Sequence, residues 1–176
     1  MRNLSKLISV PLVLLAACGG PTAAEDENPS TPSQALTTST AVQVRLLGQD
    51  AAGFTSYLLA PRSLTATGDG VPIAVTVNHS AVELTDINQA WLIGTFTVPA
   101  HVSQVEIVLQ LTNPGSVTDA HGHAALDTQG PPIRFKAPIA LLAFQHKATI
   151  TIDLLKSTSP KSANSRWMVP ELAVHF

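Results

Sequence analysis

Beyond residue 40, most of the chain alternates between apolar and polar side chains with a period of two. Val42, Val44 and Leu46 would lie on one face of an extended segment, and Gln43 and Arg45 on the other. The same alternation recurs in four further segments: 92–98, 105–111, 133–136 and 148–154. Because successive strand residues point to opposite faces of a sheet, these segments are predicted to be strands with one buried face.

The apolar faces of these segments define a predicted core. In segment 92–98 we place Leu92, Phe96 and Val98 inward, with Gly94 in an inward slot that indicates a bulge or a close contact. The residues expected at the centre of the core are Val44, Leu46, Phe96, Val98, Ile107, Leu109, Ile150 and Ile152.

Turn residues separate the apolar segments at Thr67–Gly70, Thr112–Gly115 and Thr128–Pro132. Residues 137–145 are the only candidate helix, and they could equally form a buried loop. In the tail we expect Trp167, Val169, Leu172 and Val174 to form an extended segment packed on the sheets, with Pro170 at an edge or a bulge. Many short strands with regular turns predict a single all-β domain, a β-sandwich, over residues 41–176.

The N-terminus has the pattern of a bacterial lipoprotein signal. Arg2 and Lys6 precede an apolar run, 7–17, that is shorter than the roughly 20 residues needed to span a bilayer. The run ends in Leu-Ala-Ala-Cys, which predicts a signal peptide over residues 1–17, cleavage after Ala17 and lipidation of Cys18. The thiol would take a diacylglyceryl group, and the freed amino group a further acyl chain such as palmitate. The alternative is an ordinary secreted protein with a chance cysteine at its cleavage site.

The composition of residues 18–40 predicts a disordered linker between the lipid on Cys18 and the domain. This stretch is rich in Pro, Ser and Thr, has an acidic cluster at 25–27, and shows no apolar periodicity. Cys18 is the chain's only cysteine, so an internal disulfide is excluded. Gly19 and Gly20 follow it without an Asp, which by analogy with Gram-negative lipoproteins indicates the outer membrane.

The charge of the chain excludes one class of partner. The formal net charge is −2, and no basic stripe runs along any segment. Aromatic residues make up only 5% of the chain, too few for a platform on which bases would stack. Nucleic-acid binding is therefore not expected.

The segment Asp119–Asp127, with sequence DAHGHAALD, is the strongest candidate for chemistry. In an extended chain His121, His123 and Asp127 share one face, and imidazole and carboxylate groups are ligands of zinc and copper. The same residues also fit a hairpin turn in which Gly122 adopts positive φ and Leu126 faces the core. We favour the turn, and expect no bound metal or other cofactor.

No catalytic pattern is present in the sequence. There is no Gly-x-Ser-x-Gly elbow, no His-Glu-x-x-His and no glycine-rich phosphate loop. Glu83 and Asp86 are candidates for a carboxylate pair only because acidic residues are few, and a solvated loop before Trp91 explains them better. We therefore expect no enzymatic activity.

Five segments taken in order resemble an uncharacterised family of bacterial lipoproteins that is common in myxobacteria and their relatives. They are SYLLAPRSLTATGDGVPIAVTV (56–77), ELTDINQAWLIGTFTVPA (83–100), VEIVLQLTNPGSV (105–117), LDTQGPPIRFKAP (126–138) and HKATITIDLLKS (146–157). The family often has a Gly-Tyr pair where this chain has Ala100-His101-Val102. The resemblance implies an Ig-like or prealbumin-like sandwich and an envelope location. It implies no reaction, because the family has no established activity.

Two hypotheses about function follow. The first is a membrane-anchored, non-catalytic interaction or structural module of the cell envelope, with an envelope protein or glycan as partner. The second is a small envelope metal-binding protein or hydrolase that uses the loop from His121 to Asp127.

Overall fold

The computed structural model of the chain describes residues 38–176. The predicted signal peptide, the cleavage point after Ala17, Cys18 and nearly all of the predicted linker lie outside these residues. The first strand begins at Thr40, one residue before the predicted start of the domain. No helix among the described residues is long and apolar enough to cross a membrane.

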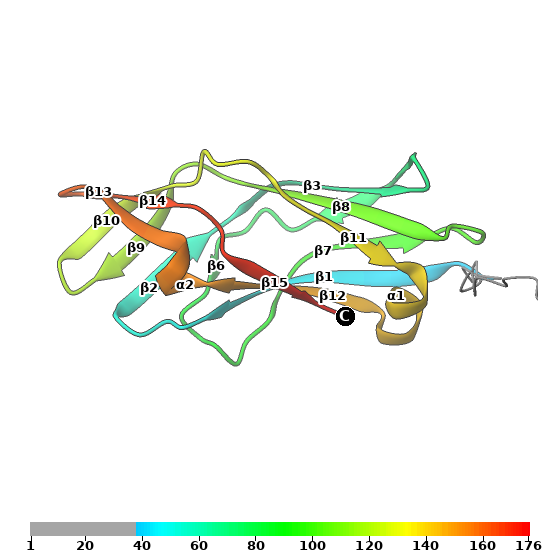
Figure 1. Cartoon of the computed structure of the whole chain (residues 1–176), viewed down its shortest axis with the longest axis horizontal. Coiled ribbons are helices and arrows are strands. Elements are labelled where there is room, and N and C mark those ends of the chain that lie inside the picture. The colour runs from blue at the N-terminus through cyan, green and yellow to red at the C-terminus, as the bar shows by residue number, and fades with distance from the viewer. Residues whose placement is uncertain (1–37) are drawn as a thin grey trace, which may run out of the picture. The chain divides into compact units, whose positions relative to one another are not determined.

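One layer of the domain is a five-stranded sheet, sheet A (Figure 1). Its central strand β1 pairs in parallel with β12 on one side and antiparallel with β7 on the other. In spatial order its strands are β15 (Leu172–His175), β12 (Lys147–Asp153), β1 (Thr40–Gln49), β7 (Trp91–Val98) and β5 (Val75–Val77).

The facing layer is sheet C, which is antiparallel throughout. Its strands are, in spatial order, β11 (Ile133–Pro138), β8 (Gln104–Leu111), β3 (Pro61–Gly68) and β4 (Val71–Ile73). Asp69 and Gly70, both with positive φ, form the turn between β3 and β4, as predicted from the sequence.

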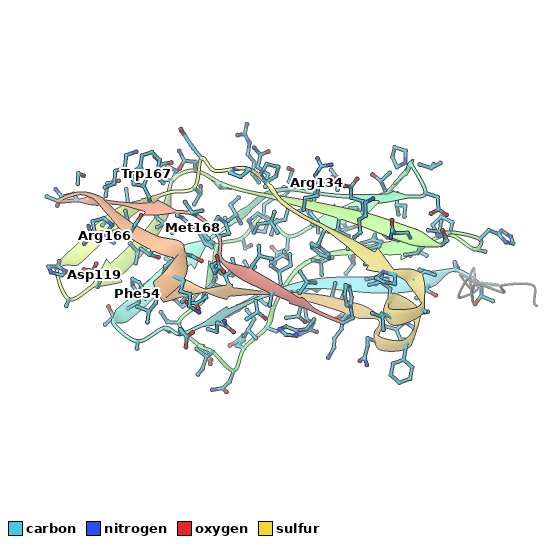
Figure 2. All side chains as sticks on the ribbon, in the orientation of Figure 1. Phe54, Asp119, Arg134, Arg166, Trp167 and Met168 are labelled. Atoms are coloured by element: carbon cyan, nitrogen blue, oxygen red, sulfur yellow. The ribbon has the colours of Figure 1, made fainter. Side chains whose placement is uncertain are left out.

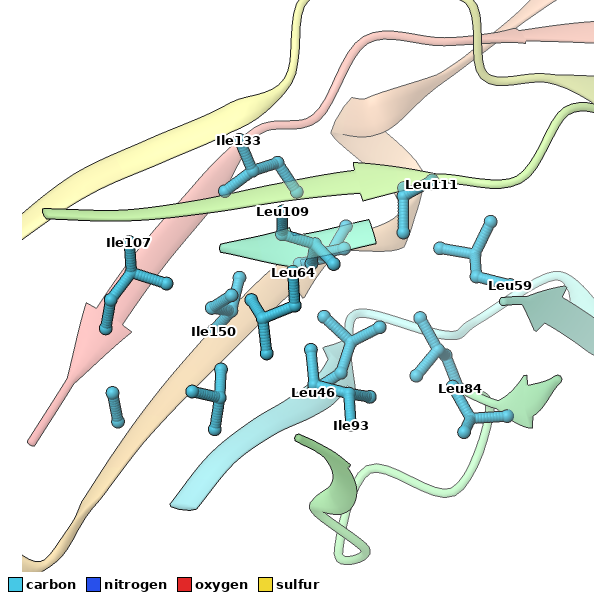
Figure 3. Packing of buried hydrophobic residues seen from close by; sticks show 14 of the residues in the cluster. Leu46, Leu59, Leu64, Leu84, Ile93, Ile107, Leu109, Leu111, Ile133 and Ile150 are labelled. Carbon is cyan, nitrogen blue, oxygen red and sulfur yellow. The ribbon is translucent and has the colours of Figure 1, made fainter. Parts of the chain in front are cut away.

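Sheets A and C bury a common apolar core (Figure 3). Leu46 and Ile150 from sheet A approach Leu64, Ile107 and Leu109 from sheet C. The eight residues predicted for the centre of the core are all at most 4% exposed. The prediction of an all-β, sandwich-like fold is therefore confirmed.

Sheet C continues around a corner into a third sheet, sheet B. Only Ala60 separates β3 from β2, and β8 passes into β9 through residues 112–114, with the Thr112 N–H donating to the Ala60 carbonyl at 2.8 Å. The predicted turn at Thr112–Gly115 thus bends the chain without reversing it. In spatial order sheet B contains β13 (Thr158–Ser162), β14 (Ser165–Met168), β10 (Gly122–Asp127), β9 (Gly115–Asp119), β2 (Phe54–Leu59) and β6 (Val82–Glu83).

Two short helices join strands. The candidate helix at 137–145 is a helix, α1 (Ile139–Gln145), and not a loop. Pro138 precedes it, and His146 ends it in the left-handed conformation with its N–H bonded to the Leu142 carbonyl. Helix α2 (Leu154–Ser157) is capped by Asp153, whose carboxylate accepts from the Lys156 N–H.

The predicted inward face of β7 was partly wrong. A register shift opposite Val44 and Arg45 changes the alternation, so Ile93 is buried and Leu92 is 39% exposed. Gly94 occupies a close contact, as predicted, since a Cβ there would lie 2.5 Å from Leu64 Cδ2. Phe96 and Val98, beyond the shift, face inward as expected.

The tail is extended, as predicted, but its buried residue is a different one. Met168 is 2% exposed, whereas Trp167, Val169 and Leu172 are all exposed. Pro170 lies between β14 and β15, so it interrupts neither strand. The chain leaves sheet B after β14 and joins the edge of sheet A as β15. The apolar residues of the tail therefore do not follow one continuous alternation of buried and exposed side chains.

Candidate functional site

The motif around His121 is the tip of a hairpin, as favoured from the sequence. Strands β9 and β10 pair antiparallel, with Asp119 opposite Gly122 and only two residues between them. Gly122 has φ of 106°, and the Asp119 carboxylate accepts a hydrogen bond from the His121 N–H at 2.7 Å. The aspartate and the glycine thus both serve the turn.

The hairpin does not bring its two histidines together. His121 lines one hollow of the surface and His123 lines another. Asp127 is ion-paired with Lys161, whose ammonium group also lies 3.8 Å from the centre of the Trp167 ring. Within residues 38–176 no group of three His, Cys, Asp or Glu side chains is placed to hold a metal ion.

The hollow that contains His121 is the candidate site. It lies on sheet B, largely against β13, and has a volume of about 400 Å³, within the range of small-ligand pockets. We name it the Arg166 hollow; its lining includes Phe54, Asp119, His121, Ser159, Ser162 and Arg166. Figure 2 shows Phe54, Asp119 and Arg166 close together at this end of the domain.

An ion pair between Asp119 and Arg166 forms the polar wall of the Arg166 hollow. Arg166 donates from Nε at 3.2 Å and from Nη2 at 2.9 Å to the same Asp119 oxygen, and from Nη1 to the Ser162 and Ser165 carbonyls. The two side chains are only 14% and 11% exposed, so solvent screens the pair weakly. The His121 N–H and then the Arg166 guanidinium lower the pKa of Asp119, which keeps it ionised at neutral pH.

The apolar wall is equally fixed. The Phe54 ring meets the Tyr57 ring edge to face, with 5.4 Å between ring centres. Tyr57 is fully buried, and its hydroxyl is 2.9 Å from the Thr158 hydroxyl. Burial raises the pKa of Tyr57 to about 12, although the Thr158 contact opposes this. Tyr57 therefore stays neutral and anchors the aromatic wall.

The carboxylate candidates Glu83 and Asp86 have structural roles. Glu83 is half-buried and accepts hydrogen bonds from the Ser56 hydroxyl at 2.6 Å and the Tyr57 N–H at 2.7 Å, as well as from Thr85. Burial raises the pKa of Glu83, but these hydrogen bonds outweigh it and lower the pKa overall. The expectation of a solvated loop thus holds for the exposed Asp86, which caps a turn at Asn88, and is wrong for Glu83.

Other hollows among the described residues have fewer ordered polar groups in their lining. Two open ones, of about 450 and 360 Å³, are lined chiefly by apolar and small side chains together with threonines, and the second also contains His123. A narrow cavity beside Met168 has a volume of about 10 Å³, the least that can hold one water molecule. The Arg166 hollow is distinguished by its ordered ion pair.

Sequence reasoning named Asp119 and His121 but missed Phe54 and Arg166. Strand β14 pairs in parallel with β10, with Arg166 opposite Leu126, and this places Arg166 beside a residue 47 positions earlier. Nothing local in the sequence encodes that pairing. The one sequence feature that could have pointed to Arg166 is its position as a single arginine directly before the apolar residues of the tail.

Comparisons with known proteins give no relative. No family model, no curated protein and no solved structure matches the chain. The resemblance to the myxobacterial lipoproteins, and with it the Ig-like or prealbumin-like topology, stays a prediction.

Proposed function

We propose that the chain is a lipoprotein anchored in the outer membrane through Cys18, with a β-sandwich that recognises an envelope protein or glycan without catalysis. The anchor is inferred from the apolar run and the Leu-Ala-Ala-Cys sequence at 15–18. No resident metal or cofactor is needed for this role.

The observation that supports recognition is the position and rigidity of the Arg166 hollow. Its lining residues Phe54, Asp119 and Arg166 (Figure 2) lie at the end of the domain opposite the start of β1 (Figure 1), where the linker enters. The donors of Arg166 are already bound to Asp119 and to backbone carbonyls, so the walls are held before any ligand arrives. A rigid pocket loses little conformational entropy on binding.

The chemistry of the lining suits sugars or short peptide segments. Phe54 offers an aromatic surface, Ser159 and Ser162 supply hydroxyl groups, and His121 supplies an imidazole that is 82% exposed. An apolar wall with a few fixed polar groups is the usual composition of a binding site. A tethered module also gains effective concentration for a weakly held partner.

The alternative, a metal-binding or hydrolytic role for the loop from His121 to Asp127, finds no comparable support. His121 and His123 belong to different hollows, and Asp127 is bound to Lys161. A catalytic metal needs three convergent ligands, each held in orientation by hydrogen bonds from neighbouring groups.

The anchor is tested by labelling cells with a radioactive fatty acid. Wild-type protein should carry label and the Cys18→Ser variant should not. Equal label in both would overturn the anchor.

Recognition is tested with a photo-crosslinking amino acid placed at Ser162, in the Arg166 hollow, or at the exposed Thr65 on β3 as a control. Irradiation of intact cells should give a discrete adduct from position 162 but not from 65, and His121→Ala should weaken it. The same adducts from both positions, or none from 162, would contradict recognition at this hollow.

A further inference from the structure

Helix α1 is apolar on the side that faces away from the protein as well as on the side that packs. Ile139 and Leu142 are 2% and 0% exposed and hold the helix against the core, whereas Leu141 is 45% and Phe144 80% exposed. A surface helix ordinarily carries polar residues on its outer face. Clustered apolar exposure marks a surface that contacts something else.

Hydrogen bonds join α1 to the other segments at this end of the domain. The Ile139 N–H donates to the Ser103 carbonyl, and the Ser103 N–H and hydroxyl donate to the Asp69 carboxylate in the β3–β4 turn. Val71, just after that turn, is 66% exposed. The exposed apolar side chains Leu141, Phe144 and Val71 thus belong to one end of the domain, which we name the α1 end.

The linker enters at the same end. The Gln43 N–H, three residues into β1, donates to the carbonyl of His146 directly after α1. The 22 residues from Gly19 to Thr40 can extend at most about 75 Å. A lipid attached to Cys18 would therefore hold the α1 end within reach of the bilayer.

The charges around α1 also suit a membrane surface. Arg134, Lys136 and Lys147 are the only charged residues between Asp127 and Asp153, and all three are exposed. Of the nearby carboxylates, Glu106 binds Arg134 and Asp69 binds Ser103. Lys136 and Lys147 form no salt bridge with a carboxylate among residues 38–176, and such exposed cations favour anionic headgroups.

We propose that the α1 end is a second membrane contact, in which Phe144 and Leu141 insert into the lipid surface beside the anchor. This inference rests on the proposed lipid anchor, because so short a helix would bind a bilayer weakly by itself and needs a second signal. The contact turns the domain so that the Arg166 hollow faces away from the membrane.

The test uses acylated, full-length mature protein in vesicles of phosphatidylethanolamine and phosphatidylglycerol. An environment-sensitive fluorophore is attached to the thiol of Phe144→Cys; Phe144 is so exposed that this change should leave the fold intact. The matched control is Ile87→Cys, an apolar side chain that is 54% exposed in the loop before β7. The loop that holds Ile87 leads into Trp91, which pairs with Leu46 in β1. Leu46 lies six residues, or about 20 Å, along β1 from Thr40, so the control position is separated from the end at which the linker enters.

On vesicles the probe at position 144 should show a blue-shifted emission and be quenched by lipids brominated along their acyl chains. The probe at 87 should show neither effect. Emission at 144 that matches emission at 87 would overturn the inference. A blue shift at 144 without quenching by brominated lipid would also overturn it, in favour of contact with a second copy of the chain.

Failure of the anchor gives a different result. Cys18 is the only native cysteine, and acylation blocks its thiol. If wild-type protein takes up the thiol probe and does not float with vesicles, the anchor itself is absent. If wild-type protein floats unlabelled while position 144 stays in water, the anchor stands and the second contact is wrong.

Discussion

At the scale of single residues, the tightest constraint on the fold is Gly48 in β1. A Cβ at this position would lie 2.0 Å from the Leu84 carbonyl oxygen, which belongs to the backbone and cannot rotate away. We expect Gly48→Ala to lower the free energy of unfolding by about 1–3 kcal/mol or more, the usual cost of overpacking.

The matched control for this substitution is Gly130→Ala, because the nearest atom to a Cβ there is the Met168 carbonyl oxygen at 3.7 Å. Urea melts of the two variants provide the measurement. Equal midpoints would show that the backbone near Leu84 gives way and that Gly48 is not required.

Tyr57 is the only tyrosine in the chain, so its ionisation can be followed directly by ultraviolet absorbance of tyrosinate. Burial raises its pKa from 10.0 to about 12, which means that the folded state holds the proton more tightly than the unfolded state. The associated stability is fully present below pH 10 and is lost as the pH rises towards 12, by up to about 3 kcal/mol.

We therefore expect the native protein to titrate near 12 and the urea-unfolded protein near 10. Alkaline destabilisation between these values should be weaker in Tyr57→Phe. A native midpoint near 10 would mean that the hydroxyl is open to solvent.

At the scale of elements, alternation predicted the strands whose partners lie in one regular sheet. It placed the inward faces of β1, β8 and β12 correctly. In a regular strand, a shift of the pairing register by one residue would turn every apolar side chain towards solvent, so the apolar pattern fixes the register. Alternation failed at β7, where the bulge between Leu92 and Gly94 buries Ile93 in place of Leu92, and in the tail, where Met168 is buried in place of Trp167. Bulges and changes of sheet are properties of pairing, which a period-two pattern does not contain.

Alternation in β8 makes a quantitative prediction for two neighbours. Ile107 is fully buried, and truncation of such a residue to Ala costs about 2–5 kcal/mol. Glu106 binds Arg134 on the surface, and exposed ion pairs contribute about 0–1 kcal/mol. In urea melts Ile107→Ala should destabilise the protein far more than Glu106→Ala, and comparable losses would mean that the inward face of β8 is misassigned.

At the scale of the whole domain, the candidate site is a product of topology. Phe54 begins β2, Asp119 ends β9 and Arg166 lies in β14. The Arg166 hollow therefore exists only once β9 has paired with β2, and β10 with both β9 and β14. The sequence could supply the hairpin turn, since Asp119 and Gly122 are local signals. The parallel pairing of β10 with β14 joins segments far apart in the chain, and no local sequence pattern predicts it.

The same topology decides what we expect of metals. His121 and His123 line different hollows, and the Asp127 carboxylate is bound to Lys161. The three side chains that share a face in an extended chain therefore do not converge on one position that a metal could occupy. We expect the melting temperature of the purified protein to be the same with and without a chelator. Titrated zinc and copper should bind weakly, and His121→Ala should not change that binding. A chelator-sensitive fold, or tight stoichiometric zinc abolished by His121→Ala, would instead make the hairpin tip a metal site and displace recognition by the Arg166 hollow as the proposed function.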